Sequence, residues 1–277
     1  MVKFYAAEER KILARVVFTG ILLSLLYAFF TDTLLHQLEQ PVLRYPYVDI
    51  TYWLMHGLGI PEFATGTMAW VFDVLLIGAC IGCWLYPGSR ILVWIFLVLY
   101  FVYFIGCNTF GAHHAGNKIG MLLIAVPFVV RNLASFNYLW QGLRYLLLFA
   151  FSSAFLWKLF RLSWLQPDQG ILIMKKNWVL YLYNNTDTVW ANVLHWLLAH
   201  PALVNGLFIT GFLMEGFFIV GFFTRNFDKV LLVLSVLLVM GFWVTADANF
   251  VELLILCLTL SPFRLQPPVH RPGIHPS

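Results

Sequence analysis

Charged residues are scarce in this sequence, making up only 11% of 277 residues, against roughly a quarter in ordinary soluble domains. The mean hydropathy is +0.81, and 61% of the residues are hydrophobic. These values exclude a soluble globular protein and predict a multi-spanning membrane protein in a lipid bilayer. The net charge of +4 is small and the Lys and Arg residues are scattered, so we expect no nucleic-acid partner.

Cysteines are also few, and all four lie in or beside apolar segments. This placement argues against a disulfide framework that holds an extracellular module. Cys80 and Cys83 form a C-x-x-C pattern, which is compatible with thiol redox chemistry or with small residues at a helix contact. No resolving thiol is near them in the sequence, so we favour the helix contact.

The histidines lack the spacing of a metal site. No two of the eight are four residues apart, the separation that puts two imidazoles on one face of a helix. We therefore predict no metal site. We favour two interpretations: the histidines lie at the membrane interface, or one of them serves as a proton donor or hydrogen-bond partner.

Long apolar runs are abundant, and about 20 apolar residues in a helix suffice to cross the hydrocarbon core. The runs predict an all-α, polytopic integral membrane helix bundle of about eight spans, at residues 12–31, 67–86, 90–107, 117–131, 142–161, 202–223, 229–245 and 249–263. The fourth, seventh and eighth are short. Short or broken helices are tolerated where protein surrounds their backbone, so they predict an interior site.

Two long connections, 32–66 and 162–201, are rich in Trp, Tyr, Pro and His. Apolar stretches within them, at 45–63 and 184–201, predict interfacial helices that cap a cavity. If the N-terminus is cytoplasmic, most Lys and Arg residues fall on the inner side, which puts both connections outside and both termini inside.

The chain is expected to form one transmembrane domain over residues 1–263. The Pro-rich segment 264–277 has no core-forming pattern and is expected to be a cytoplasmic tail. The first apolar run ends without a small-residue cleavage site, so we expect it to be retained as a span.

Ionisable side chains are rare within the predicted spans, where each needs a partner, water or a function. Asp73, Glu215 and Glu252 lie inside spans, and Asp247 lies in the break between the last two. Structural pairing with a buried cation would account for Glu215. A role for it at a functional site is the alternative.

The segment "CNTFGAHHAGNKIG", residues 107–120, is polar and glycine-rich between two apolar runs. His113, His114 and Asn117 lie in it, and its glycines permit the close backbone approach that a ligand loop needs. It is the best loop candidate for a ligand site, and a hydrophilic loop at the lipid headgroups is the alternative reading.

A lysine interrupts the apolar run "FAFSSAFLWKLFRLSW" at position 158. Lysines at a membrane interface commonly extend to the headgroups, which is one interpretation of Lys158. The other is a general base, because desolvation or a neighbouring cation disfavours the ammonium form of a lysine. Trp157, Trp164 and Arg161 are near enough in the sequence to supply both effects.

Four stretches occur in the order shown by one known family: "GAHHAGNKIGMLLIAVPF", "SSAFLWKLFRLSWLQPDQG", "GFLMEGFFIVGFFTRNFDK" and "ANFVELLILCLTLSPF". With them, residues 10–263 resemble the integral membrane domain shared by vitamin K-dependent gamma-carboxylases and the bacterial horizontally transferred transmembrane domain proteins. The resemblance implies a carboxylase-like membrane fold with a cavity that opens outward. Its bacterial members imply a bacterial inner membrane.

The resemblance also implies roles for particular residues. Lys158 would be the base that deprotonates a vitamin K-like quinol, with His114 and Glu215 as further catalytic residues. The expected substrate-binding residues are Arg161, His113, Asn117, Trp164 and Asp247. Two departures stand out: Leu156 and Trp157 replace the usual Gly before the lysine, and the large luminal domain for protein substrates is absent, which argues against protein carboxylation.

Two functions therefore compete. The first is a membrane enzyme in which Lys158 takes a proton from a hydroquinone-like or lipid-borne substrate. The second is a non-catalytic membrane subunit that anchors a membrane or soluble protein partner. A transporter is less favoured, because the sequence shows no inverted repeat.

Overall fold

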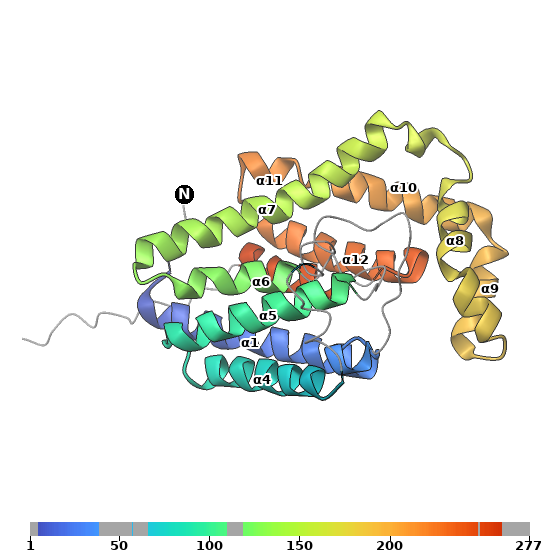
Figure 1. The fold of residues 1–277 in the computed structure, drawn as a ribbon. Helices are drawn as coiled ribbons and strands as arrows, with labels where there is room; N and C mark the ends of the chain where they lie inside the picture. The colour runs from blue at the N-terminus through green and yellow to red at the C-terminus, as the bar shows by residue number, and fades with distance from the viewer. Residues whose placement is uncertain (1–4, 39–56, 58–65, 110–118, 249, 262–277) are drawn as a thin grey trace, which may run out of the picture.

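The computed structural model describes residues 5–38, 57, 66–109, 119–248 and 250–261, and every regular element in them is helical. Six helical segments are long and apolar enough to cross a membrane. They contain α1 (Ala7–Phe30), α4 (Gly66–Leu85), α5 (Arg90–Thr109), α7 (Leu133–Phe160), α10 (Pro201–Phe217) with α11 (Val220–Phe223), and α12 (Asp228–Ala246). Figure 1 shows these helices side by side in one bundle. The all-α prediction is confirmed, and the long helices are those of a multi-pass membrane protein.

The predicted count of eight spans is not confirmed. Six of the predicted spans correspond to the long helices, but the fourth and eighth form short ones. The fourth is α6 (Ile119–Ala125) followed by the 3₁₀ helix η3 (Val126–Val129), and the eighth is α13 (Val251–Leu256) followed by η5 (Cys257–Leu260). The seventh, predicted to be short, is a regular helix of 19 residues.

The two short helices pack against each other inside the bundle, and each changes from α to 3₁₀ geometry partway along. Such breaks leave backbone carbonyls that need partners, which lipid cannot supply. Arg10 of α1 is such a partner, because its Nη2 atom donates to the carbonyls of Phe128 at 2.9 Å and Val130 at 2.7 Å. The prediction that protein surrounds these segments is met, because both belong to the main core.

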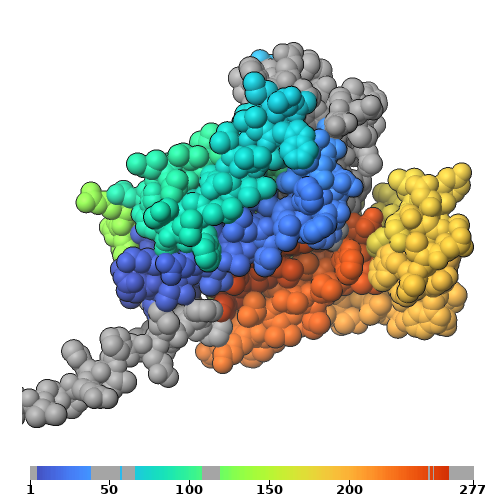
Figure 2. Space-filling model, turned by 90° about the horizontal axis from the view of Figure 1, so that it is seen from below, coloured from blue at the N-terminus to red at the C-terminus, as the bar shows by residue number. Residues whose placement is uncertain are grey.

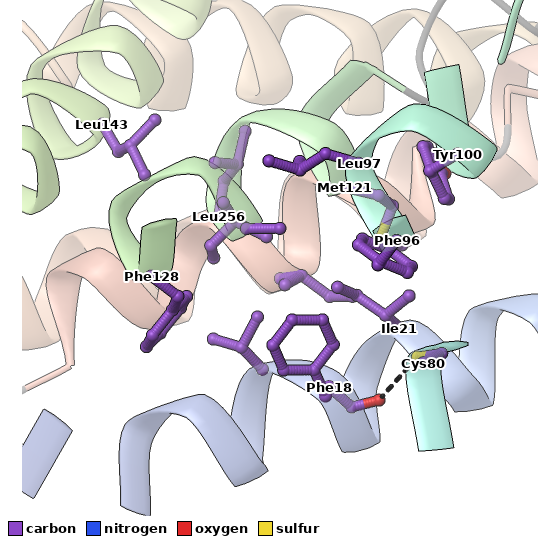
Figure 3. Close-up of a cluster of buried hydrophobic side chains, with 14 of the residues drawn as sticks. Phe18, Ile21, Cys80, Phe96, Leu97, Tyr100, Met121, Phe128, Leu143 and Leu256 are labelled. Carbon is purple, nitrogen blue, oxygen red and sulfur yellow. Dashed lines mark hydrogen bonds between the residues drawn. The ribbon is translucent and has the colours of Figure 1, made fainter. Parts of the chain in front are cut away.

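The main core is aromatic and draws on most of the spans, as Figure 3 shows. Phe18 of α1 meets Phe96 of α5 edge-to-face at 5.3 Å between ring centroids, a favoured geometry for aromatic pairs. Cys80 and Cys83 of α4 are buried and free, and the Cys80 thiol donates to the Phe18 carbonyl at 3.6 Å. This contact with α1 agrees with the helix-contact interpretation of the C-x-x-C pattern.

Two further helices, α8 (Gln169–Asn184) and α9 (Val189–Leu198), lie together at one end of the bundle. Figures 1 and 2 show them crossing that end rather than running along the spans. Together with the start of α10 they form a small second core, made of Ile171, Met174, Trp178, Leu194, Leu197 and Val204. The predicted apolar helix within 184–201 corresponds to α9, whereas α8 was not predicted.

The close packing of α8 against α10 depends on a glycine. A Cβ atom on Gly170 would lie 2.8 Å from the Val204 carbonyl oxygen and 2.9 Å from the Phe208 Cβ atom. Gly170→Ala should therefore lower the free energy of unfolding by about 1–3 kcal/mol, because backbone must move to make room. Thermal unfolding in detergent measures the effect. Gly206→Ala on α10 is the matched control, since nothing lies within 4 Å of its added Cβ, and equal losses in both variants would contradict the expectation.

Candidate functional site

The structure brings two of the three predicted catalytic residues together. The Lys158 Nζ atom, in the last turn of α7, lies 2.5 Å from the Glu215 Oε1 atom of α10. The Glu215 side chain is 1% exposed and the Lys158 side chain 25% exposed. An amine and a carboxylate at this distance share a strong, charge-assisted hydrogen bond.

Aromatic rings surround the Lys158–Glu215 pair. The Lys158 Nζ atom lies 5.7 Å from the ring centroid of Phe208 and 5.6 Å from that of Phe242, so α10 and α12 each place a π face near the cation. One turn of α10 away from Glu215, Phe212 stacks on Phe155 at 4.7 Å and on Trp164 at 6.1 Å. The pair thus lies in a setting of low polarity, where charge interactions are strong.

Close packing of α7 and α10 brings the pair together. A Cβ atom on Gly216 would lie 2.8 Å from the Phe155 ring, so this glycine lets α10 approach α7 next to Glu215. Just after α7, the Ser163 hydroxyl donates to the Lys158 carbonyl at 3.2 Å. That bond satisfies one of the carbonyls left open where the helix ends.

Three buried polar atoms on α7, η4 (Ser163–Leu165) and α10 have no hydrogen-bond partner among the described residues. They are Glu215 Oε2, Trp164 Nε1 and Ser152 Oγ. Buried polar groups are nearly always paired, so an unpaired one needs an explanation. The second oxygen of Glu215 is therefore a buried acceptor without a hydrogen-bond donor among the described residues.

The remaining predicted site residues are placed as follows. Arg161 lies over the Trp157 ring, with its Cζ atom 4.0 Å from the ring centroid, and Trp164 follows in the 3₁₀ helix η4 (Ser163–Leu165). Asp247 ends α12 with a φ of 50°. His113, His114, Asn117 and the Glu252 side chain lie outside the described residues, as do the predicted interfacial helix at 45–63 and the tail at 264–277.

A second buried carboxylate has a partner that the sequence did not identify. Asp73 of α4 accepts hydrogen bonds from the backbone N–H groups of Leu35 and His36 at 3.3 and 3.0 Å. The His36 Nδ1 atom lies 2.7 Å from Asp73 Oδ2, and the His36 ring stacks on Trp70 at 3.6 Å. Asp73 thereby holds the 3₁₀ helix η1 (Leu35–Gln37) against α4. The only signal in the sequence was an acid within a span, which needs a partner.

A third pair involves Arg144, near the middle of α7. Arg144 is buried and donates from Nη2 and Nε to the two carboxylate oxygens of Asp228, at 2.5 and 3.1 Å. Its Nη2 atom also reaches the carbonyls of Gly221 and Thr224. Arg144 is one of the Lys and Arg residues that the predicted topology places on the inner side. In the structure it joins α7 to the turn between α11 and α12.

The described residues contain no group of three or more His, Cys, Asp or Glu side chains placed to hold a metal ion. None of the four cysteines, which all lie within the described residues, forms a disulfide. Comparisons of the chain with protein-family models, curated proteins and solved structures found no match.

Proposed function

We propose that this protein is a membrane enzyme that uses the Lys158–Glu215 pair to take a proton from a hydroquinone-like or lipid-borne substrate. The observation that carries the proposal is the buried ion pair itself, with aromatic rings on several sides and one carboxylate oxygen that has no donor among the described residues. Burying a charge costs on the order of several kcal/mol per ion before the attraction between the two charges is counted. This cost favours a functional reason for keeping the pair.

The pair gives Lys158 a route to the form that a base needs. The Lys158 Nζ atom lies 2.5 Å from Glu215 Oε1, and under this proposal Lys158 passes its proton to Glu215 and becomes a neutral amine. The amine then takes the proton of a hydroquinone hydroxyl, which leaves a hydroquinone anion beside the new ammonium. The ammonium stabilises the developing anion in a setting of low polarity.

The resemblance supplies the chemical class of the substrate, a vitamin K-like quinol, and the other roles. Under this proposal His114 assists the proton transfer, while His113, Asn117 and Asp247 contact the substrate. Trp164 would donate a hydrogen bond from its Nε1–H group, which has no acceptor within the described part of the chain. Arg161, whose described contact is the Trp157 ring, would bind a part of the substrate at the lipid-facing side.

The test uses naphthohydroquinone and O₂, with the purified chain in lipid vesicles. The hydroquinone monoanion transfers an electron pair and a proton to O₂ and gives quinone and hydroperoxide anion, so deprotonation by Lys158 accelerates quinone formation. Lys158→Arg keeps a cation for Glu215 but provides no base, because arginine stays protonated. It should lower the rate about 100-fold or more, as measured by quinone absorbance.

Lys175→Arg is the matched control, because Lys175 is an exposed residue on α8. It should leave the rate unchanged. If Lys158→Arg also oxidises the hydroquinone at the wild-type rate, Lys158 is not the base.

A non-catalytic membrane subunit is the second candidate. The observation in its favour is the surface of α8 and α9, where Leu180, Tyr183 and Val189 are exposed at 65%, 82% and 82%. A membrane or soluble protein could cover them. A stoichiometric partner retained during purification in gentle detergent would support this function, and an active chain purified alone would argue against it.

For localisation we propose a bacterial inner membrane, with both termini cytoplasmic. The support is the distribution of Lys and Arg residues together with the resemblance to a family that has bacterial members. With this orientation the end of the bundle that carries α8, α9 and the Lys158–Glu215 pair faces away from the cytoplasm.

A further inference from the structure

Arg161 differs from the other arginines whose contacts hold the bundle together. Arg10 and Arg144 each donate to protein oxygen atoms, and Arg225 donates to the Gln141 side chain. Arg161 is exposed, and in the described part of the chain its guanidinium has no ion-pair or hydrogen-bond partner. Its hydrogen-bond donors are thus open to another molecule.

The guanidinium nonetheless has a defined position. Its Cζ atom lies 4.0 Å from the ring centroid of Trp157, one helical turn earlier on α7. A guanidinium held on an indole face keeps its planar set of donors oriented. The helix ends directly after Arg161 because Leu162 adopts a φ of 54°, a left-handed conformation that costs a leucine about 1–2 kcal/mol.

Exposed apolar side chains flank this cation in the sequence. Trp157 is 59% exposed and Phe160 78% exposed, and Leu162 and Leu165 are also largely exposed. Such residues around an unpaired cation would be unfavourable against water. They suit a molecule that combines an anionic group with hydrocarbon chains.

The depth of the site in the bilayer fits the same kind of molecule. The helix α7 has 28 residues and is therefore about 42 Å long, whereas the hydrocarbon core is about 30 Å thick. One end of α7 must then reach the headgroup level. Trp and Arg residues are favoured at that level, where a ring meets acyl chains and a cation meets phosphate.

We infer that Arg161 and Trp157 form a binding site for an anionic phospholipid. The guanidinium donates to the phosphate oxygens, for which its planar geometry is suited. The acyl chains lie along Trp157 and Phe160. The site does not depend on proton transfer at Lys158, whose side chain contacts Glu215 instead.

Lipid retention in native mass spectrometry tests the inference without turnover. The purified chain is exchanged into detergent with phosphatidylglycerol or with phosphatidylcholine, and bound lipids per chain are counted. The wild-type chain should retain phosphatidylglycerol in preference to phosphatidylcholine. Arg161→Gln should weaken phosphatidylglycerol binding about tenfold, because it removes the charged hydrogen bonds to the phosphate.

Three further variants separate this site from general charge attraction. Lys175→Gln, on the exposed face of α8, should retain the lipid as the wild type does. Trp157→Leu keeps an apolar side chain but removes the ring beneath Arg161, and should weaken binding in part. Lys158→Arg should retain the lipid even though it blocks the proposed proton transfer, so the two proposals fail separately.

Two outcomes would overturn the inference. One is equal retention of phosphatidylglycerol by the wild type and Arg161→Gln. The other is release of the lipid by millimolar inorganic phosphate, which would show that the site binds the phosphate group without its acyl chains.

Discussion

Lys158→Met is expected to lower the free energy of unfolding by about 3–5 kcal/mol, because it leaves a buried carboxylate without its cation. The Glu215 side chain is 1% exposed, and its Oε1 atom has no other hydrogen-bond donor among the described residues. Glu215→Leu should cost less, since the Lys158 side chain is 25% exposed and its ammonium can move toward water. Unfolding in mixed detergent micelles measures both changes.

The double variant Lys158→Met/Glu215→Leu makes this prediction specific. It removes both charges and fills the site with apolar side chains of similar size, so it should recover most of the stability lost in Lys158→Met. Lys175→Met, an exposed lysine on α8, should change stability by less than about 0.5 kcal/mol. Equal stability of Lys158→Met and the wild type would show that the two side chains are not paired inside the protein.

Arg144→Met is expected to have a loss of similar size, about 3–5 kcal/mol, because it strips a cation from Asp228 and hydrogen bonds from two carbonyls. The carbonyls belong to Gly221 and Thr224, in the connection from α11 to α12. Arg144→Lys should fall between the wild type and Arg144→Met, since an ammonium keeps the charge but lacks the planar fork that meets both Asp228 oxygens. Unfolding measured as above ranks the variants.

The control for this series is Arg131→Met. Arg131 is exposed next to the start of α7, and no ion pair of its side chain is found in the described part of the chain. Its replacement should leave stability nearly unchanged. If Arg131→Met lowers the free energy of unfolding as much as Arg144→Met does, the stability depends on positive charge in this region and not on the contacts of Arg144.

Hydrophobic runs were enough to predict the long helices, because a span must satisfy its own backbone and be apolar over its length. The same rule could not separate a full span from a buried short helix. Residues 117–131 and 249–263 are as apolar as real spans, but α6 and α13 change to 3₁₀ geometry within the core. The helix α8 was not predicted because Lys175, Lys176 and Asn177 interrupt its apolar pattern.

The members of the candidate site could be chosen from the sequence, but not their contacts. Lys158 and Glu215 were both expected at the site, since ionisable groups in apolar segments need a partner or a function. Their pairing across 57 positions depends on how α7 packs on α10. The pairing of Asp73 with His36 could not be predicted for the same reason, because it depends on how η1 packs against α4 in the folded chain. Substrate binding by Arg161 stays a prediction, and the contact of its guanidinium with the Trp157 ring was not foreseen.

Quinone formation by the double variant Lys158→Met/Glu215→Leu is the most direct test of the central claim, that the buried pair serves chemistry rather than stability. The variant is compared with the wild type in lipid vesicles that contain naphthohydroquinone and O₂, after unfolding has shown that both are equally folded. We predict that it oxidises the hydroquinone no faster than empty vesicles do. Wild-type acceleration by a folded chain that lacks both charges would contradict the account.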